Sequence, residues 1–578
     1  MDWYFVLKMV VPTGYEPKDR IRSAIVIPHG EKQRICIFGN IPDLYHGMTI
    51  GAELDGRKVV DYCIEPTDKN IAALEKAGVN PEQYGKTLEI HQMLKQEGYN
   101  WDVASTRAEE IYNVLPFPDA DKVHKEMVDN AEAAERTQAL GREVIRCARR
   151  KRKIAYKVDE YLSYFSEVEQ EGAYEQLMYS LKIMCLQASG YGFGNGMVWD
   201  NELKEKEEYV RQDIEERKQQ EYELLTKDEI QEYIDKIEGG MLEQEQIDTL
   251  WSLQTSLPCV ITGGAGVGKT TVIQNLIECY SMHYKKKNVL LIAPTGKAAR
   301  RLAEKTKMPA TTIHGALRKT PDDNYVFYNS KNVLPYRLII VDESSMVDTA
   351  LMYDLLSATE KSCKIIFVGD HNQLYPVGYG EPFFDFMKTL EVYRLTINHR
   401  QAEGTDILNN AKNVLAGMPL ECGNGVTVRH ISFMEIGDLL TRDDEDLQII
   451  SPYNDLNRQI NTFLKRGEEP LNEGDKIMTI RNTKSYCNGD IGTVVSVGSK
   501  SITIEIEGKH IVVKNAHRKD ITLAYAITVH KMQGSEAKRV MVFIPEEDSL
   551  IDKRLLYTAV TRAREKLEVY YYTNPIEE

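Results

Sequence analysis

The chain has 578 residues, of which 42% are apolar and 28% are charged, as in an ordinary globular protein of several domains. It contains no run of about 18 apolar residues, so we expect no membrane span, and its first residues lack the basic head of a signal peptide. The nine cysteines are scattered without a C-x-x-C pair, which argues against a disulfide framework, a zinc site or an iron–sulfur site and favours a reducing cytoplasm. A formal net charge of −16 excludes a broadly basic surface but leaves room for a locally basic channel.

The first part of the chain divides into three segments of different character. Residues 1–65 contain short strand-like runs separated by glycines, which predict a small β-barrel. Residues 66–200 have apolar side chains at helical spacing and predict a helical domain. Residues 201–240 are dense in charged and amide side chains, which predicts a solvated helical linker.

Two stretches inside the predicted helical domain could carry function. The basic run Arg149–Lys153 is either a nucleic-acid contact or a solvated helix face, and the second interpretation is favoured because such runs are common on surfaces. The glycine-rich stretch Gly190–Gly196 resembles a dinucleotide fingerprint only superficially. No strand precedes it, so we expect a loop there.

From about residue 241 onward, strand-like and helix-like runs alternate, which predicts an α/β fold with helices on both faces of a parallel sheet. Two insertions interrupt this alternation. Residues 316–335 contain a turn followed by the aromatic run Tyr325–Tyr328, which predicts a small hairpin. Residues 470–520 contain Ser501–Ile506, whose strict alternation predicts a half-buried strand in a small β-domain.

The most informative motif is a phosphate-binding loop of the pattern G-x-x-x-x-G-K-T, which follows an apolar run and opens a helical one. The glycines let backbone N–H groups wrap phosphates, Lys269 reaches the β- and γ-phosphates, and Thr270 offers its hydroxyl to Mg²⁺. The sequence therefore predicts a nucleoside triphosphate site. Its loop residues are Gly263, Gly264, Ala265, Gly266, Val267, Gly268, Lys269, Thr270 and Thr271.

Two later strand-like runs each end in polar side chains. One is followed directly by Asp342 and Glu343, at the edge where parallel sheets bind ligands. We expect Asp342 to hold Mg²⁺ together with Thr270, and Glu343 to orient and deprotonate the attacking water. The other run leads to Gln373, which is placed to sense the γ-phosphate.

The ordered set of motifs over residues 240–578 resembles that of superfamily 1 DNA helicases, and closely the RecD-like branch of subgroup B. Besides the phosphate loop, the similarity covers Leu242–Gln246, Ala293–Ala299, Thr312–His314, Val341–Asp348, Gly369–Gly378, His399–Gln401, Thr528–Glu536 and Tyr557–Ala563. The resemblance implies two RecA-like motor domains, residues 241–400 and 401–578, with ATP and Mg²⁺ between them. It also implies a duplex-splitting pin near 316–335, an SH3-like insertion at 470–520 and an OB-like N-terminal barrel.

The same resemblance assigns roles at the nucleotide. Gln246 would read the adenine edge, and Glu536 would lie near the sugar. Arg400 and Arg562 would reach the γ-phosphate as arginine fingers and join Lys269, Glu343 and Gln373 in catalysis. A surface salt bridge is the ordinary alternative for an arginine, and the motif context favours the fingers. His399 departs from the phenylalanine that relatives often have beside the first finger.

By resemblance, a further set would grip the backbone of single-stranded DNA without reading its sequence. It comprises Pro294, Thr295, Lys297, Thr312, His314, His530 and Lys531, together with Tyr325 and Phe327 at the pin. The alternative for the channel residues is an ordinary cap or turn role. The alternative for a pin tyrosine is packing under its own hairpin. The N-terminal region lacks the helix-hairpin-helix signature that some RecD-like proteins carry.

The leading interpretation is an ATP-dependent helicase that translocates on single-stranded DNA and unwinds duplexes, with five-prime to three-prime polarity implied by the resemblance alone. Its partners would be single-stranded and tailed duplex DNA and, through the N-terminal region, replication or recombination proteins in a bacterial or phage-infected cytoplasm. Two alternatives stay open: an ATP-gated DNA clamp or remodeller without processive unwinding, and an RNA helicase of the same superfamily. The pathway (repair, recombination or phage replication) and the role of residues 66–240 are not decided by the sequence.

Overall fold

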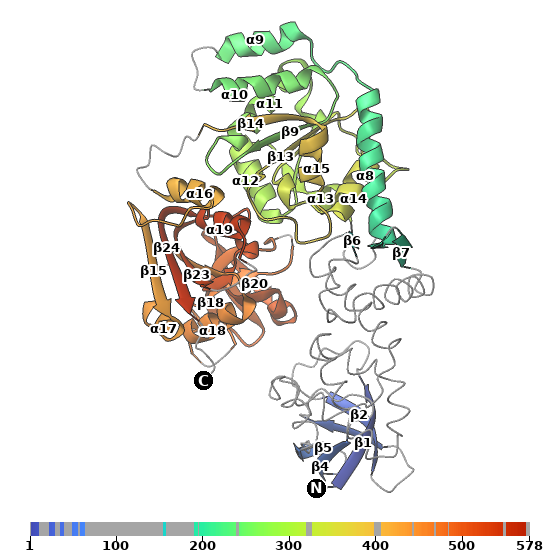
Figure 1. Ribbon diagram of the computed structural model, residues 1–578. Helices are drawn as coiled ribbons and strands as arrows, with labels where there is room; N and C mark the ends of the chain where they lie inside the picture. Colours follow the sequence, from blue (N-terminus) through green and yellow to red (C-terminus); the bar gives the residue numbers. More distant parts are fainter. Residues whose placement is uncertain are drawn as a thin grey trace, which may run out of the picture. The chain divides into compact units, whose positions relative to one another are not determined.

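The computed structural model divides into two compact units, Met1–Lys204 and Glu205–Glu578, each described by itself (Figure 1). The residues that it describes are 2–10, 22–28, 35–39, 49–55, 58–63, 154–157, 190–194, 196–237, 242–319, 326–397, 406–441, 444, 446–467, 470–483, 485–546 and 551–573. The predicted site residues Tyr325 and Arg400, the basic run at 149–153 and most of the predicted helical domain lie outside these ranges.

The N-terminal strands form a closed barrel in the order β1-β2-β3-β5-β4 (blue in Figure 1). Their bounds are β1 (Asp2–Val10), β2 (Arg22–Pro28), β3 (Ile35–Gly39), β4 (Thr49–Asp55) and β5 (Lys58–Cys63). Neighbouring strands run antiparallel except for the parallel pair β3 and β5. The OB-like character of this barrel stays a prediction.

A second sheet of the N-terminal unit contradicts one expectation. β6 (Ala155–Lys157), β7 (Tyr191–Gly194) and β8 (Met197–Asp200) pair antiparallel in the order β6-β8-β7. The loop predicted at 190–196 is therefore wrong, and this part of the predicted helical domain is a β-hairpin. A Cβ on Gly192 would lie only 2.1 Å from the indole Nε1 of Trp199. The glycine that suggested a loop is instead a strand residue over which a large ring packs.

The charged segment before the motor domains folds into two helices, α8 (Asn201–Gln219) and α9 (Lys227–Ile237). The segment is helical as predicted and most of α8 is exposed or half-buried, but one face is not solvated, because Val210 and Ile214 are buried in the core of the first motor domain. α9 likewise adds its apolar face to that domain's core. In α8, the Arg217 guanidinium is 1% exposed and donates to Asp213 at 2.5 Å and to the Thr359 carbonyl at 2.8 Å.

The first motor domain is a six-stranded parallel sheet in the order β11-β10-β12-β13-β9-β14 (green to yellow in Figure 1). The strands are β9 (Cys259–Gly263), β10 (Val289–Ala293), β11 (Ala310–Thr312), β12 (Leu338–Val341), β13 (Lys364–Gly369) and β14 (Glu391–Leu395). The helices are α10 (Gln244–Asp248), α11 (Lys269–His283), α12 (Gly296–Thr306), α13 (Ile313–Leu317), α14 (Thr349–Ser357) and α15 (Pro382–Thr389). Short 3-10 turns are η2 (Thr249–Gln254), η3 (Lys286–Asn288) and η4 (Ser344–Met346).

Strands β9, β10, β12 and β13 are buried along their whole length, which explains their continuous rather than alternating apolar sequences. Two separate hydrophobic clusters cover the two faces of the sheet. One contains Leu276 of α11 and Leu302 of α12, and the other contains Leu355 of α14 and Phe383 of α15. The predicted α/β architecture is confirmed for this domain.

The second motor domain is a five-stranded parallel sheet in the order β15-β24-β23-β16-β22 (orange to red in Figure 1). Its strands are β15 (Val426–Ser432), β16 (Leu447–Ser451), β22 (Ala526–Thr528), β23 (Ala537–Pro545) and β24 (Ala563–Thr573). Its helical elements are α16 (Ile407–Leu415), α17 (Ile436–Leu439), α18 (Asn454–Leu464), α19 (Lys553–Val560), η6 (Phe433–Glu435) and η8 (His530–Met532). This sheet confirms the prediction of a second α/β motor domain in the chain.

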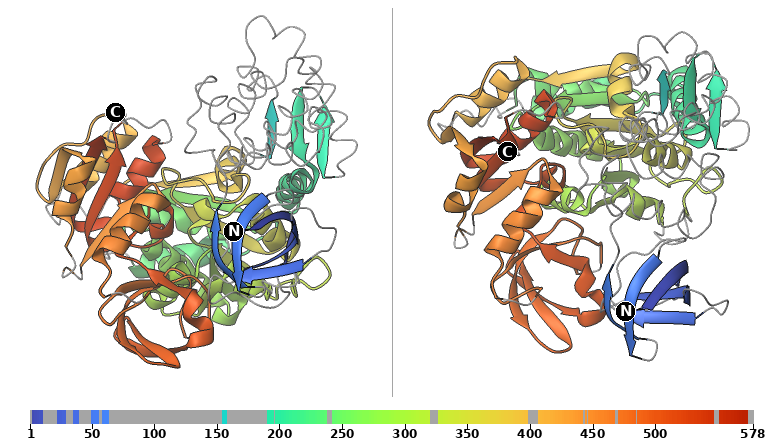
Figure 2. Two further views of the ribbon diagram at one scale, coloured as in Figure 1. Left: turned by 90° about the horizontal axis from the view of Figure 1, so that it is seen from below. Right: turned by 60° about the horizontal axis from the view of Figure 1, so that its bottom comes forward.

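The insertion at 470–520 forms an antiparallel sheet of its own in the order β20-β19-β18-β17-β21 (Figure 2). Its elements are β17 (Lys476–Thr479), β18 (Ile491–Val497), β19 (Ser501–Ile506), β20 (Lys509–Lys514), η7 (Asn515–Asp520) and β21 (Ile521–Leu523). Ile502, Ile504 and Ile506 are buried, so the alternation predicted for β19 is confirmed. No described helix is both long and apolar enough to cross a membrane.

Candidate functional site

The phosphate loop connects β9 to α11, as its sequence setting indicated. Gly266 and Gly268 have φ angles of 82° and 83°, which side chains disfavour. A Cβ on Gly263 would lie 2.6 Å from Val267 and 2.7 Å from the Leu395 carbonyl oxygen, so only glycine fits. The Lys269 ammonium donates to the carbonyls of Gly263 at 2.6 Å and Gly264 at 2.9 Å, which places its charge at the mouth of the loop.

The two adjacent carboxylates stand at the end of β12. Asp342 Oδ1 accepts from the Glu343 backbone N–H at 2.9 Å. Burial and the neighbouring Glu343 carboxylate raise the pKa of Asp342 to about 7, against the opposing pull of Lys269 and Arg301. Glu343 has a left-handed φ of 51°, and its Oε2 is buried without a hydrogen-bond partner among the described residues. Such an oxygen fits a water molecule that must be oriented.

The donor set suits Mg²⁺. Thr270 and Asp342 line the same cavity and supply one hydroxyl and one carboxylate, which are hard oxygen ligands. No group of three or more metal-ligating side chains occurs in the described part of the chain. A cation held by one or two protein oxygens plus phosphates is the usual arrangement for Mg²⁺ at a nucleotide.

Gln373 lies after β13 and is 3% exposed. Its Nε2 is 3.4 Å from Asp370 Oδ2, and its Oε1 has no hydrogen-bond partner among the described residues. Asp370 is fully buried and also accepts from the Asn372 N–H at 2.9 Å. The Gln373 side chain is therefore positioned through its Nε2, while its Oε1 is available to accept a hydrogen bond.

Arg562 comes from the second motor domain and is 4% exposed. Its guanidinium donates to the Thr558 carbonyl at 2.9 Å, the Ser535 carbonyl at 3.0 Å and the Thr561 hydroxyl at 3.1 Å. In the described residues no carboxylate forms an ion pair with it. A buried cation that is oriented by neutral acceptors is suited to stabilise a phosphate.

These side chains line one cavity of about 300 Å³ between the two motor domains. The first domain contributes the loop from Gly264 to Thr271 and the residues Arg301, Asp342, Glu343 and Gln373. The second domain contributes Gly534, Glu536 and Arg562. Glu536 accepts from Arg301 of the first domain and from Arg564 of its own, both at 2.9 Å, so it bridges the two walls.

Gln246 does not itself line this cavity but contacts the loop that does. It is 4% exposed, and its Nε2 is 3.5 Å from the Val267 carbonyl of the phosphate loop. Its reading of the adenine edge stays a prediction.

Sequence reasoning gave no role to three residues of α19 that contact the first motor domain. The Tyr557 hydroxyl donates to Asp370 Oδ2 at 3.0 Å, and the Thr558 hydroxyl accepts from the Leu374 N–H at 3.1 Å. Arg554 donates to the Gln373 carbonyl at 3.1 Å. Their spacing of i, i+3 and i+4 places them on one helix face. This spacing is the sequence feature from which a shared contact surface could have been predicted.

Two of the residues expected to grip DNA act as helix caps. The Thr295 hydroxyl accepts from the Ala298 N–H at 3.2 Å at the start of α12. The Thr312 hydroxyl accepts from the Gly315 N–H at 2.9 Å at the start of α13. Burial lowers the pKa of His314, which follows Thr312 in that helix. The cap role that the sequence left open is thus present, and a DNA contact from the same residues stays a prediction.

A basic groove of about 650 Å³ lies between α18, η7 and β22. Four cations, Arg458, Arg518, Lys519 and Lys531, line it, and its described wall contains no carboxylate. Asn454, Asn457, Asn461, Thr462 and Thr528 add amides and hydroxyls. Asn457 is 4% exposed, and its Nδ2 has no hydrogen-bond partner among the described residues. Lys531 was expected to contact DNA, whereas the asparagines of α18 were not foreseen.

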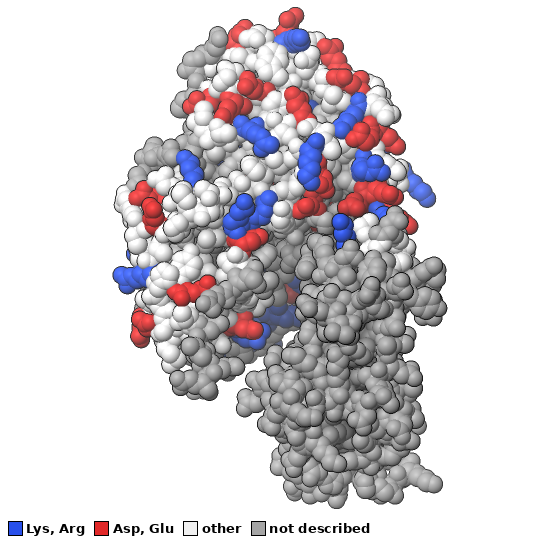
Figure 3. All heavy atoms as spheres, viewed as in Figure 1, with Lys and Arg blue, Asp and Glu red and all other residues white. Residues whose placement is uncertain are grey.

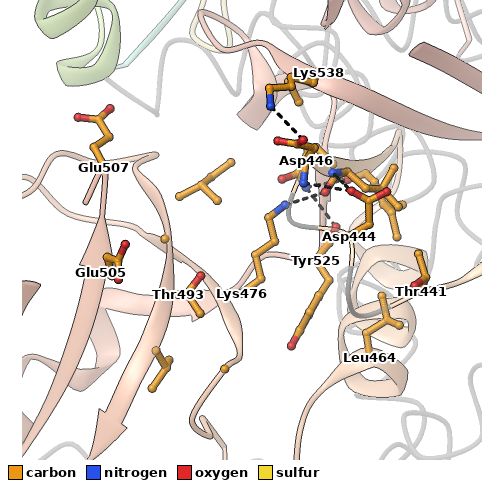
Figure 4. A pocket seen from close by; sticks show the side chains of 18 of the residues that line it. Thr441, Asp444, Asp446, Leu464, Lys476, Thr493, Glu505, Glu507, Tyr525 and Lys538 are labelled. Atoms are coloured by element: carbon orange, nitrogen blue, oxygen red, sulfur yellow. Dashed lines mark hydrogen bonds and ion pairs between the residues drawn. The ribbon is translucent and has the colours of Figure 1, made fainter. Parts of the chain in front are cut away.

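A cavity of about 840 Å³ lies between the insertion and the second motor domain and is also lined by Lys297 (Figure 4). Its charges compensate one another: Lys538 pairs with Asp446 at 3.0 Å, and Arg539 pairs with Asp444. Burial lowers the pKa of Lys297. On the face of the motor unit drawn in Figure 3, Lys and Arg are likewise interspersed with Asp and Glu.

The comparisons with known proteins agree with this arrangement. Residues 246–379 match the AAA domain family, and residues 523–570 match the UvrD-like helicase C-terminal domain family. The chain is 31% identical over 356 residues to the ATP-dependent RecD2 DNA helicase of Deinococcus radiodurans, over 56% of this chain and 48% of that protein. It therefore spans about half the length of that relative.

A second relative is matched over most of its length. The chain is 30% identical over 404 residues to the RecBCD enzyme subunit RecD of Mycolicibacterium smegmatis, which is 58% of this chain and 72% of that protein. A solved structure, Bacteroides Pif1 helicase in complex with ADP-AlF3 and ssDNA, is 20% identical with a TM-score of 0.40, over 57% of this chain and 92% of that one. The chain belongs to the RecD-like superfamily 1 helicases.

Proposed function

We propose that this chain is an ATP-dependent DNA helicase that translocates on single-stranded DNA from five-prime to three-prime and unwinds duplexes. The observation that carries the proposal is the cavity whose phosphate loop, Asp342 and Glu343 come from one motor domain and whose Arg562 comes from the other. Hydrolysis in such a cavity is coupled to domain movement, because each domain supplies part of the site. The family supports DNA as the track, and the polarity rests on the family alone.

The residues fit a consistent division of labour for hydrolysis. Loop N–H groups and Lys269 bind the phosphates, and Thr270 and Asp342 would hold Mg²⁺, which neutralises phosphate charge when bound. Glu343 orients the attacking water and accepts its proton, since one of its oxygens is buried and unpaired among the described residues. Arg562 stabilises the charge that develops on the transferring phosphoryl group. Arg400 is proposed for the same task by family likeness.

The DNA grip is proposed on chemical grounds. A groove with four cations, several amides and no described carboxylate suits a phosphate backbone, and it does not read bases. In the first motor domain, the Thr295 and Thr312 hydroxyls accept from helix N–H groups and each keeps a proton that would be donated to a phosphate. The grip should therefore be independent of sequence and sensitive to salt.

The predicted pin is supported by one exposed aromatic. Phe327 is 38% exposed, and the Arg318 guanidinium lies 5.1 Å from its ring centroid. Tyr328 instead packs against the hydrophobic core of the first motor domain. Lys319 pairs with Val326 across the base of this segment. We assign Phe327 the stacking on the last base pair.

Protein partners belong to the proposal as well. Replication or recombination proteins would bind through the N-terminal unit. What supports this is that the relative from Mycolicibacterium smegmatis is named as a subunit of the RecBCD enzyme.

One set of assays tests the function. ATP hydrolysis is measured with and without single-stranded DNA or RNA, and strand separation is measured on duplexes with five-prime or three-prime tails. We expect DNA to stimulate hydrolysis and a five-prime tail to be required. A three-prime requirement would overturn the polarity, RNA in place of DNA would favour the RNA helicase, and hydrolysis without separation would favour the clamp.

Glu343→Gln is the matched catalytic control. The amide keeps the size of the side chain but accepts no proton, so we expect kcat for ATP to fall by about 10²–10⁴-fold. ATP affinity should stay within about twofold, because Glu343 is not among the groups that hold the phosphates. Unchanged hydrolysis in this variant would show that the attacking water is activated elsewhere.

A further inference from the structure

Helix α19 docks on the loop that follows β13 through one face. Arg554 donates to the carbonyls of His371 and Gln373, and its guanidinium lies 4.2 Å from the ring centroid of Tyr375. The Thr558 hydroxyl accepts from the Leu374 N–H at 3.1 Å. The loop that presents Gln373 to the nucleotide cavity is thereby held by the helix that leads to Arg562.

Tyr557 lies at the centre of this contact and reaches further than its neighbours. Its hydroxyl donates to Asp370 Oδ2 at 3.0 Å and accepts from the Ala265 N–H at 3.4 Å. A Cβ on Gly264 would lie 2.9 Å from the same oxygen. One atom of the second motor domain therefore contacts both the phosphate loop and the carboxylate that holds Gln373.

The hydroxyl is a firm donor in this setting. Tyr557 is 4% exposed and Asp370 is fully buried, so the hydrogen bond to the carboxylate is shielded from water. Burial and the Asp370 charge raise the pKa of Tyr557, which keeps its proton in place at ordinary pH. Without it, the Asp370 carboxylate would keep, among the described residues, the Asn372 N–H at 2.9 Å and the longer bond from Gln373 at 3.4 Å.

We propose that Tyr557 is a positioning residue for ATP hydrolysis, whose hydroxyl fixes the phosphate loop and, through Asp370, the Gln373 amide when the two motor domains dock. The proposal rests on the hydrolysis proposed above. Under this proposal the catalytic site is complete only when the two motor domains are docked, because Tyr557 and Arg562 lie on the same segment of the second domain. Binding of ATP to the first domain needs no such contact.

Tyr557→Phe tests the proposal, because it removes the hydroxyl and leaves the ring. We expect kcat of DNA-stimulated hydrolysis to fall about tenfold, the loss that one charge-assisted hydrogen bond represents. The dissociation constant of a fluorescent ATP analogue should change by less than about twofold, since a contact made on docking affects the rate rather than ground-state binding.

Tyr525→Phe is the matched control. Tyr525 is 5% exposed, and its hydroxyl donates at 3.1 Å to Asp475, which is also fully buried, away from the nucleotide cavity. We expect this variant to have the same kcat as the unaltered chain. Similar thermal unfolding temperatures of the two variants would show that stability alone does not explain a difference in rate.

A double-mutant cycle with Asp370→Asn tests the route to Gln373. If the hydroxyl acts through Asp370, the double variant should lose little more kcat than the more impaired single variant. Fully additive losses would overturn the relay. An unchanged kcat in Tyr557→Phe, or an equal loss in Tyr525→Phe, would overturn the role of Tyr557. Absence of DNA-stimulated hydrolysis in the unaltered chain would instead overturn the proposed function.

Discussion

Gly263 shows how tightly single residues are constrained where the phosphate loop leaves β9. A methyl group there would meet Val267 at 2.6 Å and a backbone oxygen of Leu395 at 2.7 Å, and the backbone has little freedom to withdraw. The loop would have to move away from the position in which its N–H groups face the phosphates.

Gly263→Ala should therefore raise the dissociation constant for ATP at least about tenfold, which corresponds to overpacking of about 1.4 kcal/mol. Equilibrium titration with a fluorescent ATP analogue measures this. Gly437→Ala is the control, because a Cβ on Gly437 in α17 would meet nothing within 4 Å. Equal affinities for the two variants would contradict the steric argument.

Individual site residues were predictable where a motif fixes their surroundings. The phosphate loop, Asp342, Glu343 and Gln373 line one cavity because parallel strands end at a common edge. Tyr557 belongs to a recognised motif, yet its role was not foreseen. Its partner Asp370 lies 187 residues away in the chain, and no local pattern reports such a pairing.

At the scale of elements, α8 is fixed to the first motor domain by a buried guanidinium. Arg217 donates to Asp213 at 2.5 Å and to the carbonyls of Thr359 at 2.8 Å and Glu360 at 2.7 Å. Lys361 also pairs with Asp213. Removing Arg217 leaves buried oxygens without their donor, which costs far more than the loss of an exposed pair.

Arg217→Ala should lower the free energy of unfolding by about 3–5 kcal/mol, as is usual when one partner of a buried ion pair is removed. Urea unfolding followed by circular dichroism measures the change. On the same helix, Lys218 forms a partly exposed pair with Glu215 at 2.8 Å, and Lys218→Ala should cost less than about 0.5 kcal/mol. A loss below about 1 kcal/mol for Arg217→Ala would show that α8 is held mainly by its apolar face.

Elements were predictable where one physical signal dominated. β19 alternates as its sequence does, because one face covers the core of the insertion. α8 was predicted to be solvated because its sequence has few apolar residues among many charges, although Val210 and Ile214 stand one helical turn apart and share a face. The β7–β8 hairpin was missed because Gly192 packs against Trp199, a long-range fit that composition does not reveal.

At the scale of the whole molecule, a net charge of −16 is compatible with DNA binding because the cations are segregated. The groove beside α18 gathers Arg458, Arg518, Lys519 and Lys531 without a described carboxylate. On the face of the motor unit drawn in Figure 3, by contrast, positive and negative side chains are mixed. Local potential, rather than total charge, decides where a polyanion binds.

Lys531→Ala should weaken binding to single-stranded DNA of every sequence alike. It should also reduce the slope of log affinity against log salt by about 0.7, the value for one phosphate contact on a single strand. Fluorescence anisotropy at several salt concentrations measures both. Lys538 is paired with Asp446, so Lys538→Ala should leave this slope unchanged. An equal reduction of the slope in both variants would show that the groove beside α18 is not a special site for DNA.

The docking of α8 and α9 also bears on how the motor can be produced in isolation. The motifs begin near residue 242, and a recombinant fragment cut there would discard Val210, Ile214, Tyr233 and Ile234 from a core that they help to close. The apolar surface left behind would favour aggregation during expression. A cut before Asn201, where α8 begins, retains both helices together with the compact unit from Glu205 onward, and is the boundary suited to crystallisation and assay.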